Sequence, residues 1–365
     1  MSNTSWYNPN NSLLLACFVC LAFISFQASA ALIDDLYDAK IEVLDQSQIN
    51  YKKALRQALQ QVLVKVSGNR TLLDSSLISQ NLSRAADYLR SYRYETLDGR
   101  LYLLINFAPQ RIEKMIRVAG FPVWDKRRPD SIIWLAVEEP QSRQRRILSR
   151  ETDIALFEAL KISASERGIE IIEPLWDLND RQQIGLYDIW GGFSQKINQA
   201  SKRYDVEAVL SARLFQGKVA DNEESINWLA DWRFSHNGEL MSGQIAGSEQ
   251  VLLLSTLVNV LADKLAAEYA VDLTGRDPNE AKAEISIMNV ASLGSYVQVL
   301  KFLNSLSVVA KAALIVQQGE KATFQLDLLG DKEDLIRALN LDDKIKPVMD
   351  EFGQPRQELA FIWAL

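Results

Sequence analysis

The feature that most constrains this chain is an apolar run near its N-terminus, LLLACFVCLAFISF, over residues 13–26. Residues 27–30 (QASA) follow it, and this A-x-A pattern is typical of a signal-peptide cleavage site. The run of about 14 residues is shorter than the roughly 20 that a membrane-spanning helix needs. We therefore expect a signal peptide over residues 1–30, cleavage after Ala30, and a mature chain that folds outside the cytoplasm.

The segment before the apolar run leaves an alternative to cleavage open. Its first twelve residues contain no Lys or Arg, so the α-amino group is its only positive charge, whereas signal peptides usually begin with a basic region. The alternative is a short uncleaved anchor that faces the same compartment. Lipidation is disfavoured, because Ala31 stands where a lipoprotein has cysteine. After cleavage we expect no stable membrane span.

Cleavage of residues 1–30 would remove both cysteines, so the mature chain could not be stabilised by disulfides. Both cysteines, Cys17 and Cys20, lie in the apolar run, so their CxxC spacing has no redox or metal role after cleavage. Without disulfides the fold depends on packing, and a hydrophobic content of 48% is sufficient for two or three ordinary domains. The net charge of −7, with both signs interspersed, argues against nucleic-acid binding.

Residues 31–125 are predicted to form an α+β domain. The stretch 37–44 alternates like a half-buried strand, and residues 47–66 place apolar side chains at helical spacing before Gly68. The further expected elements are a helix over 75–90, a hairpin that turns at Asp98 and Gly99, and a helix over 111–119. The polar, punctuated segment WDKRRP (124–129) then leads to the next domain.

Residues 126–271 are predicted to form a central α/β domain with a mixed sheet. The nearly continuous apolar run 131–137 indicates a strand covered on both faces, and Asn237 with Gly238 indicates a hairpin turn. A helix over 151–167 and a strand over 169–172 complete a βαβ unit in outline. The other expected elements are a helix over 192–203, strands over 207–215, 226–234 and 239–245, and a closing helix over 249–269.

Residues 271–281 (VDLTGRDPNEA) have Gly, Pro and charges without apolar periodicity, which is typical of a linker. Residues 282–365 then predict a C-terminal ferredoxin-like βαββα unit. Its expected elements are a strand over 284–290, a helix over 293–306, strands over 308–317 and 322–328 around Gly319, and a helix over 332–339. The expected fold class is therefore α/β and α+β.

The chain carries no sequence motif that marks a catalytic site. GxSxG, HExxH, Walker A and GxGxxG patterns do not occur, and the single histidine, His236, is expected to be a solvated side chain beside the Asn237–Gly238 turn. We therefore assign no catalytic, cofactor-binding or metal-ligating residues and expect no cofactor.

Charged residues at the end of the 131–137 strand are the best candidates for chemistry. Glu138 and Glu139 follow this strand, at the edge where open α/β sheets bind ligands. A basic cluster follows them in the next loop and helix start, and its guanidinium groups suit carboxylate or phosphate. Its members are Arg143, Arg145, Arg146 and Arg150. Adjacent carboxylates on an extended chain point to opposite faces, so a solvated strand end and loop is the simpler interpretation.

The tryptophans allow two interpretations. Trp228 and Trp232 are four residues apart on one predicted strand and share a face, while Trp176 and Trp190 flank a polar stretch. An outward face would suit a peptide, glycan or protein partner. An inward face would be core beneath the last helix, and this is the interpretation we favour.

Several stretches resemble the proteobacterial family known as domain of unknown function 2066. They are LYDAKIEVLDQSQINYKKALRQALQQVLVKVSGN (36–69), FPVWDKRRPDSIIWLAVEE (121–139), LYDIWGGF (186–193), RYDVEAVLSARLF (203–215) and NWLADWRF (227–234). The resemblance implies an exported envelope protein, and it carries over no site residues because that family has no assigned activity. The middle region is also similar in fold to the N-terminal domain of the periplasmic protein TolB and to curli-secretion-type lipoprotein domains, which mediate protein contacts.

Two functions follow as expectations. The first is a periplasmic, non-enzymatic binding or scaffold protein that contacts an envelope protein or peptide through a strand edge or an aromatic face. The alternative is a periplasmic hydrolase or small-ligand-binding enzyme that uses Glu138 and the arginine cluster in a deep polar pocket at the end of the 131–137 strand.

Overall fold

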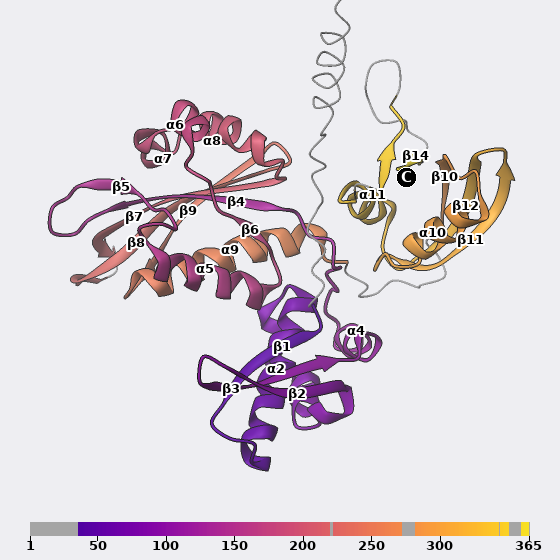
Figure 1. The fold of residues 1–365 in the computed structure, drawn as a ribbon, viewed down its shortest axis with the longest axis horizontal. Coiled ribbons are helices and arrows are strands. Elements are labelled where there is room, and N and C mark those ends of the chain that lie inside the picture. The colour runs from indigo at the N-terminus through magenta and orange to yellow at the C-terminus, as the bar shows by residue number, and fades with distance from the viewer. Residues whose placement is uncertain (1–35, 220–221, 272–281, 343, 350–358, 365) are drawn as a thin grey trace, which may run out of the picture.

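A computed structural model describes residues 36–219, 222–271, 282–342, 344–349 and 359–364. The predicted signal peptide lies outside these residues, and so does the predicted linker except for Val271. The described chain is a mixed α/β fold with three sheets, one N-terminal, one central and one C-terminal (Figure 1). The predicted fold class is confirmed.

The N-terminal sheet is antiparallel, with the strand order β1-β3-β2. Its elements are β1 (Asp38–Val43), α2 (Gln48–Ser67), a 3-10 turn (Arg70–Asp74), α3 (Ser76–Leu82), a second 3-10 turn (Ala85–Tyr88), β2 (Leu89–Leu97), β3 (Arg100–Phe107) and α4 (Pro109–Val118). Alternation along β1 buries Ala39, Ile41 and Val43 in the core with the helices and leaves Lys40 and Glu42 exposed. The helices thus cover one face of this sheet, and the other face carries polar side chains.

The predicted helix over residues 75–90 is wrong in its second half. α3 ends at Leu82, and β2 begins at Leu89, which pairs with Phe107 of β3. The two strands meet at a tight turn in which Asp98 and Gly99 both have positive φ. Residues 83–88 form a turn and a 3-10 helix instead, and strand pairing takes only Leu89 and Arg90 from the predicted helix. The strand order leaves β1 and β2 as the two edges of the sheet.

The central sheet has the order β5-β4-β7-β8-β9, and β6 pairs with β4 in parallel. Its elements are β4 (Ser131–Glu138), β5 (Arg145–Ile147), α5 (Ile154–Arg167), β6 (Ile171–Ile172), α6 (Leu178–Gln183), α7 (Leu186–Gly191), α8 (Ser194–Ser201), a 3-10 turn (Lys202–Tyr204), β7 (Ala208–Val219), β8 (Asn222–His236), β9 (Glu239–Gly247) and α9 (Gln250–Tyr269). Figure 1 shows α5 and α9 on one face and α6–α8 on the other. Every residue of β4 is buried between these layers, as its apolar run predicts.

Helix α9 is the element of the described chain whose length and hydropathy would suit a membrane span. In this fold it is a core helix, because a stripe of leucines packs onto the central sheet beside α5. The buried stripe comprises Leu253, Leu254, Leu257, Leu261 and Leu265.

The C-terminal sheet has the order β11-β12-β10-β14-β13. Its elements are β10 (Lys282–Met288), α10 (Leu293–Leu303), β11 (Val309–Gln318), β12 (Lys321–Leu328), α11 (Lys332–Asn340), β13 (Ile345–Pro347) and β14 (Ala360–Trp363). The βαββα order agrees with the prediction, and the sheet is extended by β13 and β14, two short strands that the sequence pattern did not reveal. Their strand state follows from pairing, since β14 lies parallel to β10 and β13 antiparallel to β14.

The WDKRRP segment is largely buried, which the prediction of a polar connecting segment missed. Trp124 and Arg128 are each 1% exposed, and Arg127 is 8% exposed. The Arg128 guanidinium stacks on the Trp124 ring at 3.9 Å and donates to the Lys65 carbonyl in the last turn of α2 at 2.7 Å. It also donates to the carbonyls of Arg167 and Gly168 at the end of α5, at 3.0 and 2.7 Å.

These bonds make Arg128 a joint between the N-terminal and central sheets. The C-terminal end of a helix has carbonyl groups without a partner in the helix and carries partial negative charge. One buried cation therefore pairs with carbonyl groups at the ends of two helices. Burial lowers the pKa of the Arg128 guanidinium to about 9. Because this value is still well above 7, the side chain stays protonated at neutral pH. The neighbouring Arg127 reaches the C-terminal part of the chain, where its Nε lies 2.7 Å from Asp342.

Candidate functional site

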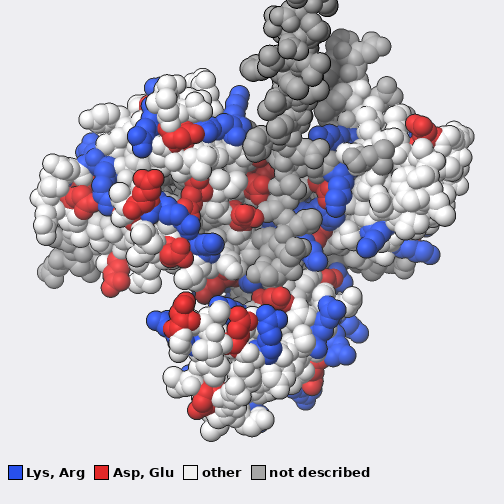
Figure 2. All heavy atoms as spheres, in the orientation of Figure 1, with Lys and Arg blue, Asp and Glu red and all other residues white. Residues whose placement is uncertain are grey.

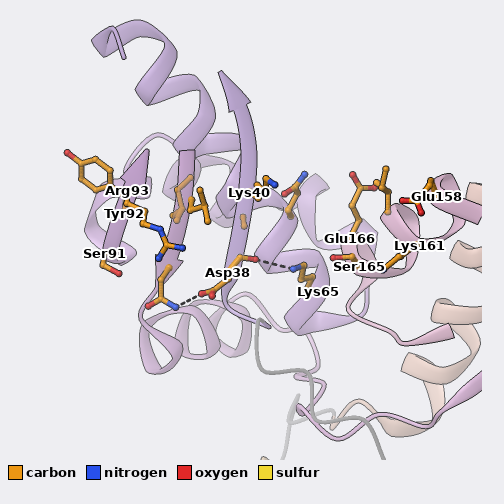
Figure 3. Close-up of a pocket in the computed structure, with 16 residues that line it drawn as sticks. Asp38, Lys40, Lys65, Ser91, Tyr92, Arg93, Glu158, Lys161, Ser165 and Glu166 are labelled. Carbon is orange, nitrogen blue, oxygen red and sulfur yellow. Dashed lines mark hydrogen bonds between the residues drawn. The ribbon is translucent and has the colours of Figure 1, made fainter. Parts of the chain in front are cut away.

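A groove of about 810 Å³ lies between the N-terminal sheet and α5 (Figure 3). A hollow of this size falls in the range of ligand and peptide sites. The sheet contributes Asp38, Lys40, Arg93 and Leu104, and α5 contributes Lys161 and Glu166. Figure 3 shows the labelled sheet residues and the labelled α5 residues on opposite sides of the opening.

Buried arginines hold the walls of the groove in place. Arg128 joins the ends of α2 and α5, and Arg167 of α5 donates to the Gly68 carbonyl at 2.9 Å. Arg167 also pairs with Asp263 of α9 at 2.6 Å and is 3% exposed. Because the Arg128 bonds and the Arg167–Gly68 bond are buried, the wall formed by α5 is fixed relative to the sheet that faces it.

The edge strand β1 presents free backbone groups to this groove. The Tyr37 carbonyl accepts from the Phe107 amide at 3.0 Å, so residues 39, 41 and 43 also point their backbone groups at β3. The backbone groups of Asp38, Lys40 and Glu42 then point away from the sheet. Lys65 confirms this direction, because its Nζ donates to the outward Asp38 carbonyl at 3.0 Å (Figure 3).

Among the described residues, the groove leaves more positive than negative charge unpaired, since Glu166 is the one lining carboxylate without a side-chain partner. The carboxylate of Asp38 accepts from the Asn106 side chain, and that of Glu158 accepts from Arg150 at 3.3 Å. Lys40 lies 4.3 Å from the Tyr102 ring, and Arg93 has only an exposed contact with Glu95 at 3.4 Å. Within the described residues, neither Lys40 nor Lys161 has a carboxylate partner. Elsewhere both signs of charge are interspersed over the face shown in Figure 2.

Sequence reasoning did not identify this groove. Its cations come from β1, α2, β2 and α5, elements that are spread over residues 38–167 of the chain, so no local motif connects them. The one available signal was the alternation of Lys40 and Glu42 with buried residues in β1, which marks one polar face.

The two predicted carboxylates diverge onto different arginines. Glu138 accepts from Arg143 at 2.8 Å and from Arg145 at 3.0 Å, and these hydrogen bonds hold its pKa below the usual value. Glu139 instead accepts from Arg146 at 2.7 Å. The arginines lie on β5 and the loop before it, where a loop and helix start were predicted, and β5 pairs with the end of β4. Strand pairing therefore uses three members of the basic cluster to neutralise the strand end, while Arg150 follows β5 and pairs with Glu158 and Glu173.

A crevice of about 750 Å³ lies at the carboxyl end of β6, beside the end of β5. Arg146, Arg150 and Trp176 line it, whereas Glu138 and Glu139 do not. Arg146 is held there by Asp153, with two contacts at 2.7 and 2.8 Å. The crevice therefore lies near the predicted pocket without bringing the predicted carboxylates into it.

Asp153 gives a testable acid dependence of stability. Burial raises the pKa of its carboxyl, but hydrogen bonds from Arg146, Thr152 and Ser149 outweigh burial and lower the pKa below 3.8. The stabilisation is therefore present above about pH 4 and is lost as pH falls through the lowered pKa. We expect Asp153→Asn to lower the free energy of unfolding by about 2 kcal/mol at pH 7 and by less at pH 2. Urea unfolding at both pH values measures this, and an equal loss at both would contradict it.

The tryptophans are mainly core residues, which is the interpretation that we favoured from the sequence. Trp232 is 8% exposed and lies in the central core, and Trp228 packs against the same core. Trp176 lies edge-on to Trp134 at 5.1 Å, and Trp190 is stacked by Arg145 at 4.3 Å. The partner-binding aromatic face is therefore not formed by Trp228 and Trp232.

The expectation that His236 is solvated is wrong. Its side chain is at the end of β8 and the residue is 3% exposed. Nδ1 lies 2.8 Å from the Glu207 carbonyl and Nε2 lies 2.8 Å from the Tyr269 hydroxyl. The reason is tertiary, because the end of α9 packs over the hairpin turn and covers the ring.

Comparison with known proteins identifies two family regions. Residues 281–355 match DUF2066, so the predicted resemblance to that family is confirmed over these residues, which include β10 to β13. Residues 30–125 match a different family, described as a domain of unknown function (DUF8605). The stretches that suggested the resemblance lie outside 281–355, and the first of them lies within 30–125. No curated protein matches the chain.

One solved structure that matches is described as the crystal structure of an uncharacterized protein. It is 11% identical, and the match covers 39% of this chain and 91% of that chain with a TM-score of 0.19. A likeness at this score carries no argument about the fold. The similarity of the middle region to the TolB N-terminal domain stays a prediction.

Proposed function

We propose that this chain, whose residues 281–355 match the DUF2066 family, is an exported, non-enzymatic binding protein of the periplasm. Its partner is an envelope protein, and the groove between the N-terminal sheet and α5 receives a segment of that partner. The observation that carries the proposal is the unpaired backbone edge of β1 along a groove of about 810 Å³.

The side chains of the groove support binding rather than catalysis. Lys40, Arg93 and Lys161 offer charge and hydrogen bonds, and Leu104 offers an apolar contact between the strands. Histidine, the side chain that acts most often as a general acid or base, is absent from the described lining residues. The N-terminal apolar run with its A-x-A site supports export.

Site-specific photo-crosslinking in cells tests this function. A photo-reactive amino acid at Lys161, on the groove wall, should yield one discrete adduct with a partner protein, since crosslinking requires close approach. The matched control is Lys321, an exposed lysine on β12, which should yield none. Mass spectrometry of the adduct should also show a chain that begins at Ala31.

Two results would contradict the proposal. The first is the same adduct from both positions, or none from either. The second is an adduct whose chain is not exported. A chain that is exported but keeps residues 1–30 would instead support the uncleaved anchor.

A further inference from the structure

We infer that the segment bound in the groove is acidic and extended, and that it joins the N-terminal sheet as an antiparallel strand beside β1. This inference rests on the proposed function, because it assigns the chemistry of the partner to the same groove. It is argued from the direction of the backbone groups of β1 and from the charges that remain unpaired around them.

The edge of β1 offers a short ladder of hydrogen bonds. Lys40 and Glu42 both point N–H and C=O away from β3, and residues two apart on a strand are separated by about 6.6 Å. This spacing matches the alternation of an added antiparallel strand. The Asp38 carbonyl already accepts a hydrogen bond from Lys65, so the ladder available to an added strand ends at Asp38. Within the described residues, no other backbone group pairs with this edge.

The charges around the edge select the side chains of the strand. Lys40, Leu104 and Arg93 lie in one row across the three strands, because Leu104 pairs with Lys40 on one side and with Arg93 on the other. Lys161 faces this row from α5. Among the carboxylates near this edge, Asp38, Glu42 and Glu158 have side-chain partners, and Glu166 on α5 is the lining carboxylate without one among the described residues. An acidic side chain opposite Lys40 on an added strand would therefore lie beside that lysine and across the groove from Lys161, while Arg93 adds positive charge from the far edge strand β2.

Register makes this inference specific. In an antiparallel pair, residues directly opposite each other place their side chains on the same face of the sheet. A strand residue that exchanges hydrogen bonds with Lys40 therefore carries its side chain on the face of Lys40 and Arg93. The acidic residues of the bound strand should be the same residues that pair their backbone with β1.

Binding of labelled synthetic peptides to the mature chain tests the inference. The probe is a nine-residue peptide that alternates Glu with Val, and its matched control has Lys in place of Glu. We expect fluorescence anisotropy to show saturable binding of the Glu peptide only. N-methylation of the Glu amides should abolish this binding, whereas N-methylation of the Val amides should leave it within about twofold, since only the former remove donors that face β1.

Variants of the chain separate backbone pairing from charge. Lys40→Ala removes the charge and keeps the amide, and Lys40→Pro also removes the outward N–H without breaking a bond to β3. We expect Lys40→Pro to bind about tenfold more weakly than Lys40→Ala. Lys161→Gln should weaken binding about threefold at low salt and much less at 0.5 M salt, while Lys264→Gln, on an exposed site of α9, should change nothing.

The outcomes distinguish this inference from the proposed function. Equal binding of Lys40→Pro and Lys40→Ala would overturn strand addition, as would equal effects of the two N-methylated peptides on the wild-type chain. The peptide result decides the question if the proline variant fails to fold. Crosslinking at Lys161 without binding of the Glu peptide overturns the inference alone. A doubled molar mass in solution that Lys40→Pro abolishes would assign the edge to a second copy and also overturn it.

Discussion

Replacing Arg128 with methionine should lower the free energy of unfolding by at least about 3 kcal/mol, because buried carbonyl groups would lose their donor. Methionine fills a similar volume but donates no hydrogen bond. The carbonyls affected belong to Lys65, Arg167 and Gly168, at the ends of two helices, and the stacking on Trp124 would be lost as well. Urea unfolding monitored by circular dichroism measures the change.

The control for this prediction is Arg143→Met. The Arg143 side chain is 66% exposed and pairs with Glu138 at the protein surface, so its removal should cost no more than about 1 kcal/mol. Hydrogen exchange adds a local measurement, since the last turn of α2 should lose protection before the C-terminal sheet does. Equal losses of stability in the two variants would contradict the role of Arg128 as a joint.

Replacing Gly68 with alanine should destabilise the chain by about 3–5 kcal/mol, through strain and overpacking together. Gly68 ends α2 with φ of +66°, a conformation that costs an L-residue about 1 kcal/mol. An added Cβ would also lie 2.4 Å from the Ala266 Cβ and 2.9 Å from Trp124 Cε3, well inside contact distance. Close approach of α2 to α9 therefore requires glycine here.

Gly99→Ala separates the two contributions. Gly99 has φ of +77° in the β2–β3 turn, but an added Cβ would meet nothing within 4 Å. Its replacement should cost only about 1 kcal/mol, since strain acts there without a clash. Thermal unfolding of both variants measures the difference, and a cost at Gly68 no larger than at Gly99 would show that the helix end relaxes away from α9.

Both predictions concern the joint that positions the proposed groove. Arg128 and Gly68 set how closely the end of α2 approaches α5 and α9, and these contacts determine the distance between β1 and the groove wall. A destabilised joint should therefore also weaken peptide binding, even though neither residue lines the groove.

Local patterns predicted most elements of the central sheet. The apolar run of β4 indicated a strand buried on both faces, and the Asn237–Gly238 pair indicated the hairpin turn that joins β8 and β9. These signals are reliable because a buried strand and a tight turn restrict residue type over a few positions. β5 was missed, since its strand state comes from pairing with Glu138 and its neighbours rather than from its own alternation.

The candidate site was far less predictable. The prominent charges, Glu138 with the arginines after it, neutralise one another at a strand end. The lysines of the groove were unremarkable in the sequence, because their importance depends on which elements face one another. His236 illustrates the same limit, since a residue beside a turn is usually solvated and is here covered by α9.

By itself, the sequence determined the alternation of β1, the glycine that ends α2 and the absence of cysteine beyond the N-terminal run, because each depends on residue type over a short stretch. The burial of Arg128 and the direction of the Lys40 backbone toward a groove follow from the packing of the folded chain. Both depend on helix ends and strand edges that meet from distant parts of the chain. Burial of a side chain and the free hydrogen-bonding groups of a strand edge depend on which distant segments pack together, so no short stretch of sequence predicts them.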